Sequence, residues 1–198
     1  METLEEVAQE ILQCKKCELH KTKTRYVVGS GNEKAEIVFI GEAPGREEDI
    51  RGEPFVGSAG KLLSEMINAI GLRRDEVFIS NVLKCRPPNN RDPLPEEIEA
   101  CGEYLLRQLE IIKPNIIICL GRYSTEFIFR TFGLQFTSIT KLQGKIFEID
   151  AWEKKVKIIP LYHPAAVLYR PQLRDEYVEN FRKIGSLIKK RQKTLSDF

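Results

Sequence analysis

The chain has 198 residues, enough to bury a sizeable core without help from disulfides or metal. Its composition, 42% hydrophobic and 30% charged, excludes a disordered or collagen-like chain, and its apolar runs are far shorter than the roughly 18 residues that cross a bilayer. The net charge is only +2, so composition alone does not indicate a partner. Because no linker divides the sequence, we expect a single domain over residues 1–198, with a short basic tail at about 189–198.

The first helix is predicted at residues 4–12, where Thr3 and Glu6 form a capping box ahead of an apolar stripe. The glutamates of this segment give it the wrong charge for a signal peptide, so we expect the protein to stay in the cytoplasm. Further apolar stripes predict helices at 62–70, 95–112, 123–130 and 177–188. Continuous apolar runs predict strands at 37–40, 77–79, 116–120 and 156–161, with an additional edge strand at 145–150.

Strands that are apolar throughout and alternate with helices are typical of a parallel sheet with both faces covered. The sequence therefore predicts an α/β fold, a three-layer α/β/α sandwich around a central four-stranded parallel sheet. In open sheets of this kind, ligands bind beyond the carboxyl ends of the strands. Three of the four strand ends carry unusual residues, namely the turn Gly41-Glu42-Ala43-Pro44-Gly45, Asn81, and His163 followed by Pro164.

Each of these residues suits a ligand but also has a structural explanation. The turn at 41–45 either presents backbone N–H groups or simply reverses the chain. Asn81 offers a donor and an acceptor side by side, which suits the edge of a uracil base, or it forms an Asx turn. Phe55, on a loop, is either a stacking platform for a base or a packing residue. His163, at the end of a strand, favours a functional role.

The five cysteines divide into one core residue and a candidate metal site. Cys119 lies in an apolar run, where cysteine behaves as a small hydrophobe. The other four, which we expect to be reduced in the cytoplasm, combine one C-x2-C pair with two distant residues: Cys14, Cys17, Cys85 and Cys101. Structural zinc usually takes two C-x2-C pairs, whereas an iron–sulfur cluster tolerates lone cysteines. Spacing alone leaves a cluster, zinc and unrelated cysteines open.

Several motifs occur together between Cys14 and Arg170. They are Cys14-x2-Cys17, Gly41-Glu42-Ala43-Pro44-Gly45, Pro54-Phe55-Val56-Gly57, Asn81-Val82-Leu83-Lys84-Cys85-Arg86-Pro87-Pro88, Cys101 and His163-Pro164-Ala165. In this combination and order the chain resembles the thermostable, iron–sulfur-containing uracil-DNA glycosylases, family 4 of that superfamily. The resemblance implies a four-stranded parallel sheet between helices, a 4Fe–4S cluster on the four cysteines, and excision of uracil from DNA, which starts base excision repair.

The resemblance also implies roles for single residues. A glycosylase must turn the nucleotide out of the duplex to reach its base. The extruded uracil would stack on Phe55, while Asn81 reads its Watson–Crick edge and the backbone of Gly41, Glu42 and Ala43 lines the opposite wall. The histidine at position 163, as a neutral imidazole, would donate to the uracil O2 as negative charge develops there.

The chain departs from the better-known glycosylases of the superfamily in one loop. They carry an aspartate that positions the attacking water where this chain has Ala43, and a thymine-excluding tyrosine where it has Gly45. Water activation and exclusion of thymine must therefore come from elsewhere, and Glu42 and Glu48 are the nearby acids. We hypothesise that Glu48 closes the pocket near C5 of the base or orders the water. The alternative is that Glu48 belongs to a solvated acidic loop.

DNA binding requires a wedge and phosphate contacts. We expect Val167 or Leu168 to press into the minor groove and Arg170 to meet a phosphate. The expected partner is uracil-containing DNA, single- or double-stranded, with no membrane, and the expected state is a monomer. Two rival functions remain open. An iron–sulfur electron carrier would account for the cysteines but not for the placement of Asn81, Phe55 and His163. A non-catalytic nucleic-acid-binding module would account for the basic residues but would not need a pocket.

Overall fold

A computed structural model describes the backbone of residues 2–196 and the side chains of residues 2–189. Its sheet has the order β1-β3-β2-β4-β6-β5. The strands are β1 (Ser30–Gly31), β2 (Ile37–Gly41), β3 (Phe78–Asn81), β4 (Ile116–Leu120), β5 (Phe147–Ala151) and β6 (Lys154–Leu161). The four inner strands pair in parallel, which confirms the predicted four-stranded parallel sheet as the centre of the fold. The additional edge strand predicted at 145–150 is β5, whereas β1 was not predicted; both edge strands pair antiparallel with their neighbours.

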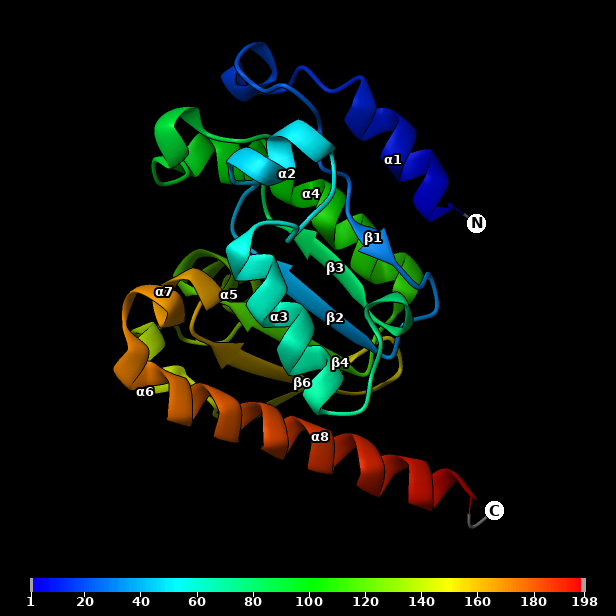
Figure 1. The fold of residues 1–198 in the computed structure, drawn as a ribbon. Helices are drawn as coiled ribbons and strands as arrows, with labels where there is room; N and C mark the ends of the chain where they lie inside the picture. The colour runs from blue at the N-terminus through cyan, green and yellow to red at the C-terminus, as the bar shows by residue number, and fades with distance from the viewer. Residues whose placement is uncertain (1, 197–198) are drawn as a thin grey trace.

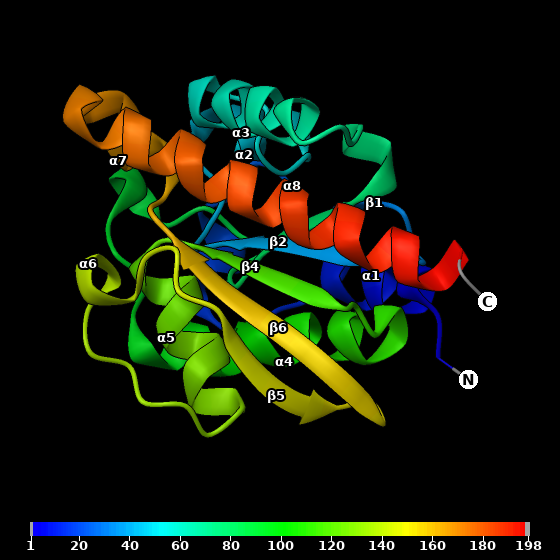
Figure 2. The same cartoon turned by 90° about the horizontal axis from the view of Figure 1, so that it is seen from below.

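Helices cover both faces of this sheet, so the predicted three-layer sandwich is confirmed. They are α1 (Leu4–Leu12), α2 (Arg46–Arg51), α3 (Ser58–Ala69), α4 (Pro95–Ile112), α5 (Arg122–Thr131), α6 (Ile139–Leu142), α7 (Pro164–Tyr169) and α8 (Arg174–Ser196), with single 3-10 turns at 18–21, 74–76, 88–90 and 171–173. Seen along the sheet, α3 and α8 lie on one side and α4 and α5 on the other (Figure 2). No helix within residues 2–196 has the length and apolarity needed to cross a membrane.

The core follows from the alternation of side chains along each inner strand. Phe39 and Ile118 pack toward α3 and α8, whereas Val38 and Ile117 pack toward α4 and α5. Cys119 is fully buried on the α4 side, which confirms its prediction as a core residue. The inner strands point toward the end of the molecule that carries α2 and α7, so their carboxyl ends meet there (Figure 1).

Local signals begin the first helix and cover one edge of the sheet. The predicted capping box is present, since the Glu6 amide donates to Thr3 Oγ1 over 3.2 Å and the Thr3 amide donates to Glu6 Oε2 over 2.8 Å. At the β5 edge, Lys155 and Lys157 pair across the strands with Asp150 and Glu148. The basic tail expected at about 189–198 lies beyond the described side chains, apart from Lys189.

Candidate functional site

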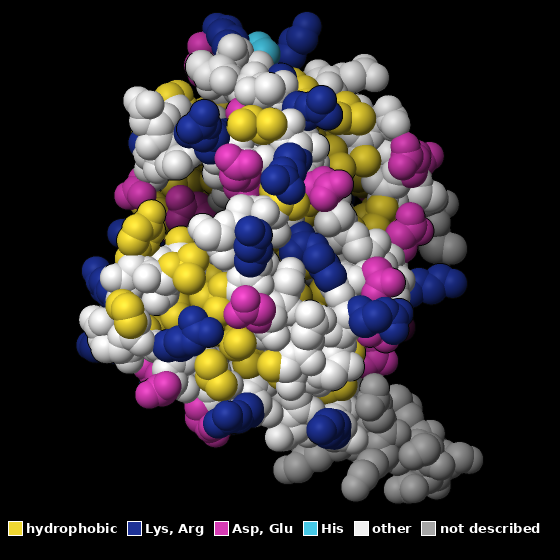
Figure 3. Space-filling view, viewed as in Figure 1, with side chains coloured by type: hydrophobic (Ala, Val, Ile, Leu, Met, Phe, Trp, Pro, Cys, Tyr) yellow, Lys and Arg dark blue, Asp and Glu magenta, His cyan; other side chains and the backbone are white. Residues whose placement is uncertain are grey.

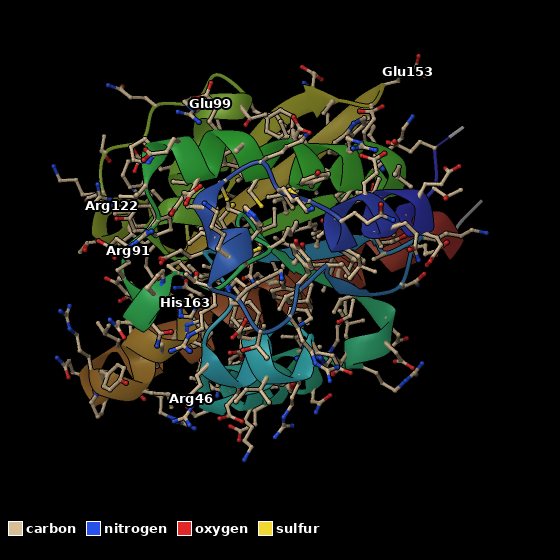
Figure 4. The ribbon with its side chains drawn as sticks, turned by 90° about the horizontal axis from the view of Figure 1, so that it is seen from above. Arg46, Arg91, Glu99, Arg122, Glu153 and His163 are labelled. Carbon is tan, nitrogen blue, oxygen red and sulfur yellow. The ribbon has the colours of Figure 1, made fainter. Side chains whose placement is uncertain are left out.

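A cavity of about 380 Å³ opens at the carboxyl ends of β2, β3 and β6, where the sequence predicts a ligand site. It brings together six predicted site residues: Glu42, Ala43, Glu48, Phe55, Asn81 and His163. Seen from above, His163 lies at this end of the sheet, with Arg91 and Arg46 on opposite sides of it (Figure 4). Both arginines line the cavity, a position that the sequence analysis did not predict for either of them.

Gly41 lies directly against the side chains of Asn81 and Phe55, two residues that line the cavity. A Cβ atom at this position would lie 2.3 Å from Asn81 Oδ1 and 2.6 Å from Phe55 Cζ, so only glycine permits this approach. Asn81 is 2% exposed, and its Oδ1 has no hydrogen-bond partner within the described residues. Because buried acceptors are nearly always satisfied, this oxygen is suited to receive a ligand N–H.

His163 caps the N-terminus of α7. Its Nδ1 accepts from the Ala165 amide over 3.2 Å, and burial lowers the pKa of His163 to about 4. The ring is therefore neutral near pH 7, with Nδ1 as the acceptor and its single proton on Nε2. The ring stacks on Phe55 with centroids 5.5 Å apart. The site thus holds a neutral imidazole donor, as the sequence analysis expected.

The two acids have different surroundings. Burial raises the pKa of the half-buried Glu42 to about 7; the like charge of Asp92 adds to this effect, and Arg122 opposes it. Such a group can take a proton near neutral pH. Glu48 instead accepts through Oε1 from the amides of Val56 and Gly57, at 2.9 and 3.0 Å. Its carboxylate therefore holds the chain just after Phe55.

The Phe55 loop is fixed from several sides, by contacts that the sequence analysis did not find. Phe55 has a φ of +51°, which is unusual for an aromatic residue. Arg74 donates to the carbonyl of Pro54. Gly60 lets α3 approach closely, since a Cβ there would lie 1.9 Å from the Phe55 carbonyl oxygen. These contacts are tertiary, and residue spacing gives no signal for them.

The four predicted ligand cysteines line one small enclosed cavity beside α1 and α4, together with Tyr26 and Tyr104. Tyr26 donates to the Cys14 carbonyl over 2.5 Å. Burial raises the pKa of the Cys85 and Cys101 thiols, a cost that metal coordination of the thiolates offsets. Within residues 2–189, no three of the potential ligands converge tightly enough for a single metal ion. The donor set, four thiols on one cavity, fits an iron–sulfur cluster.

Comparisons with known proteins agree with this geometry. A family model described as the Uracil DNA glycosylase superfamily matches residues 28–184. The chain belongs to this superfamily. It is 65% identical, over all of both chains, to the type-4 uracil-DNA glycosylase of Archaeoglobus fulgidus. It is 55% identical to that of Sulfurisphaera tokodaii over 94% of this chain and 86% of the relative, and 47% identical to that of Thermotoga maritima over 96% of each. Within the superfamily it therefore groups with the type-4 enzymes.

For this member of the superfamily, the structure corrects one of the predicted DNA contacts. Val167 is 2% exposed and packs in the core on the α3 and α8 side, so it is not available as a wedge. Leu168 and Tyr169 are 41% and 86% exposed, and Arg170 is exposed beside them. The sequence analysis missed Tyr169. On the face shown in Figure 3, apolar side chains gather over α7 and α3, while basic and acidic side chains are interspersed.

Proposed function

We propose that this chain excises uracil from DNA by hydrolysing the N-glycosidic bond, which leaves an abasic site and starts base excision repair. One observation carries the proposal. A cavity of about 380 Å³ brings an unpartnered buried amide oxygen, an aromatic ring and a neutral imidazole to the same strand ends. The type-4 uracil-DNA glycosylases of the comparisons support the same reaction.

Base recognition follows from the amide of Asn81. Uracil presents N3–H as a donor beside O4 as an acceptor, and a carboxamide complements both at once. The unpartnered Asn81 Oδ1 would accept from N3–H, and Nδ2 would donate to O4. Phe55 would supply the stacking surface, and Gly41, which Asn81 and Phe55 both approach closely, would form the floor. Cytosine presents the opposite pattern and would be rejected.

Bond cleavage leaves a cationic sugar and a uracil anion whose charge collects partly on O2. A donor aimed at that oxygen lowers the barrier because its interaction strengthens as the bond breaks. The Nε2–H of His163 would be this donor, since Nδ1 is engaged by the Ala165 amide. The low pKa of His163 keeps the ring neutral, which suits an electrophile rather than an acid.

Water completes the reaction by adding its oxygen to C1′ of the sugar. Glu42 would accept the proton from that water, because its raised pKa lets the carboxylate act as a base near neutral pH. The uracil anion leaves and takes its own proton from solvent. Glu48, whose carboxylate holds the amides of Val56 and Gly57, would set the wall of the pocket beside Phe55 rather than activate water.

Cys14, Cys17, Cys85 and Cys101, which line one cavity, would hold a 4Fe–4S cluster, the cofactor implied by the resemblance to the family 4 enzymes. When bound, the cluster supplies a covalent cross-link between the N-terminal segment and the loop after β3. That loop is already joined to the pocket, since the Val82 amide donates to the Gly41 carbonyl over 3.0 Å. The cysteines would therefore stabilise the base-binding loop.

The exposed Leu168 and Tyr169 would meet the DNA bases, and Arg170 a phosphate. We propose a monomer that acts on uracil-containing DNA in the cytoplasm, in a compartment that keeps the cysteines available to iron.

An oligonucleotide with a single uracil tests this function. The expected products are free uracil and an alkali-labile site, with none from a matched oligonucleotide containing thymine. Retention of the uracil oligonucleotide without release of base would instead support a binding module. Metal analysis of the purified protein tests the cofactor, because iron supports the cluster and zinc contradicts it.

A further inference from the structure

A buried lysine lies between the cysteine site and the base-binding cavity. Lys84 is 1% exposed, and its Nζ donates three hydrogen bonds, to Ser80 Oγ, the Asn81 carbonyl and Gln108 Oε1, at 2.7, 2.8 and 2.9 Å. Its backbone amide donates to Cys101 Sγ over 3.2 Å. Within the described residues its ammonium has no carboxylate in contact. A buried charge with neutral partners is costly, so an apolar residue would serve packing better.

The network around Lys84 is closed. Ser80 Oγ also donates to Gln108 Oε1 over 3.0 Å, and Gln108 Nε2 donates to the Val28 carbonyl over 2.6 Å. All three ammonium donors therefore have acceptors, and each acceptor is itself fixed. An arrangement that is fully satisfied in a low-dielectric interior is rigid.

One of these bonds acts directly on the peptide group that follows Asn81. Lys84 holds its carbonyl from one side, and on the other side the Val82 amide donates to the Gly41 carbonyl over 3.0 Å. With both ends held, the peptide plane cannot rotate, and the backbone from which the Asn81 side chain projects is fixed. The Asn81 carboxamide that projects from this backbone lies against Gly41, and within the described residues its Oδ1 has no partner.

We propose that Lys84 is a positioning residue for base recognition, which aims the Asn81 carboxamide into the cavity by fixing the peptide after it. The inference rests on the proposed function, because it assumes that Asn81 reads the base. If this role is right, replacing Lys84 should weaken binding of the base itself and should have little effect on binding of the sugar–phosphate backbone.

The test compares Lys84→Met with wild type, Asn81→Ala and the control Ile158→Val, which changes a buried residue of β6 outside this network. Three quantities are measured on the iron-loaded full chain: the inhibition constant of free uracil, the affinity for abasic DNA, and the iron content with its visible absorption. For Lys84→Met we expect free uracil to bind about tenfold more weakly, as for one misaligned hydrogen bond. Abasic DNA and iron should match wild type, and Ile158→Val should match it throughout.

The outcomes separate the two proposals. If Asn81→Ala weakens uracil inhibition and Lys84→Met does not, the role of Lys84 is refuted while base recognition by Asn81 stands. If neither variant changes uracil inhibition, the recognition proposal itself fails. If Lys84→Met folds but loses iron or abasic-DNA affinity along with uracil, the lysine serves the structure as a whole and the positioning role is refuted.

Ser80→Ala decides the matter if Lys84→Met does not fold. This variant removes one of the three acceptors and keeps the charge, so free uracil should bind about threefold more weakly, with iron unchanged, as expected for a partly loosened network. An unchanged inhibition constant in a folded, iron-containing Ser80→Ala protein would overturn the positioning role.

Discussion

The pH dependence of uracil release is the sharpest test of the role proposed for Glu42. Burial raises the pKa of this carboxyl from 4.5 to about 7. Only the ionised form can accept a proton from water, and it makes up about one tenth of the protein at pH 6 and about nine tenths at pH 8. The rate of the chemical step should therefore rise about tenfold between these pH values. His163, with a pKa of about 4, stays neutral throughout and adds no step.

The assay is single-turnover release of uracil from an oligonucleotide, with enzyme in excess so that chemistry is observed. In Glu42→Gln the rate at about pH 8 should fall at least about tenfold, and the rise with pH should disappear. Asp92→Asn removes a like charge that raises the pKa of Glu42, so the midpoint should move to lower pH while the maximum rate is kept. A Glu42→Gln enzyme that keeps the wild-type step at the same pH would refute the assignment.

Four further substitutions test the pocket, each by the same single-turnover assay. His163→Ala should slow release about a hundredfold or more, by about 3 kcal/mol, the loss of one oxyanion donor; a rate within about threefold of wild type would remove it from this role. Asn81→Asp should weaken uracil recognition, because the aspartate would place an acceptor, in place of the amide donor, opposite the acceptor O4. It should also admit cytosine, which carries a donor amine at that position; unchanged uracil activity would show that another group reads the base edge. Gly41→Ala should cost at least about tenfold in a folded protein, since its Cβ would displace Asn81 and Phe55; full activity would contradict the described floor. Glu48→Ala should lower the rate by freeing the amides of Val56 and Gly57; if neither the rate nor discrimination against thymine changes, the contacts of Glu48 with this loop do not serve the reaction.

The central part of the fold was predictable from local pattern. Four continuous apolar runs became the four parallel strands, and long apolar stripes became α1, α3, α4, α5 and α8. The short helices were not predicted, because four to six residues are too few to show a helical period. α7, for example, is six residues long and begins at the cap made by His163. β1 has only two residues and is defined by its pairing with β3, which no local pattern records.

The candidate site was predictable where a rule of the fold applied. The rule that ligands bind at carboxyl strand ends placed Gly41, Asn81 and His163 together; in the structure Asn81 and His163 line one cavity, and Gly41 lies against Asn81 and Phe55. Residues that act through long-range contacts gave no such signal. Val167 was one of two candidate wedges, and only its packing against α3 and α8 shows that it is buried. Arg74 stands twenty residues from the Pro54 carbonyl that it holds.

The two edge strands of the sheet, β1 and β5, affect how readily the protein aggregates at high concentration. A sheet built around long apolar runs would be hazardous if another copy of the chain could extend it. At one margin β1 offers only Ser30 and Gly31, too little backbone for a lasting ladder. At the other, β5 carries Glu148 and Asp150, already engaged by lysines on its inner neighbour, so an incoming strand would meet a row of carboxylates. Both edges of the native sheet therefore disfavour pairing with a strand from a second copy of the chain.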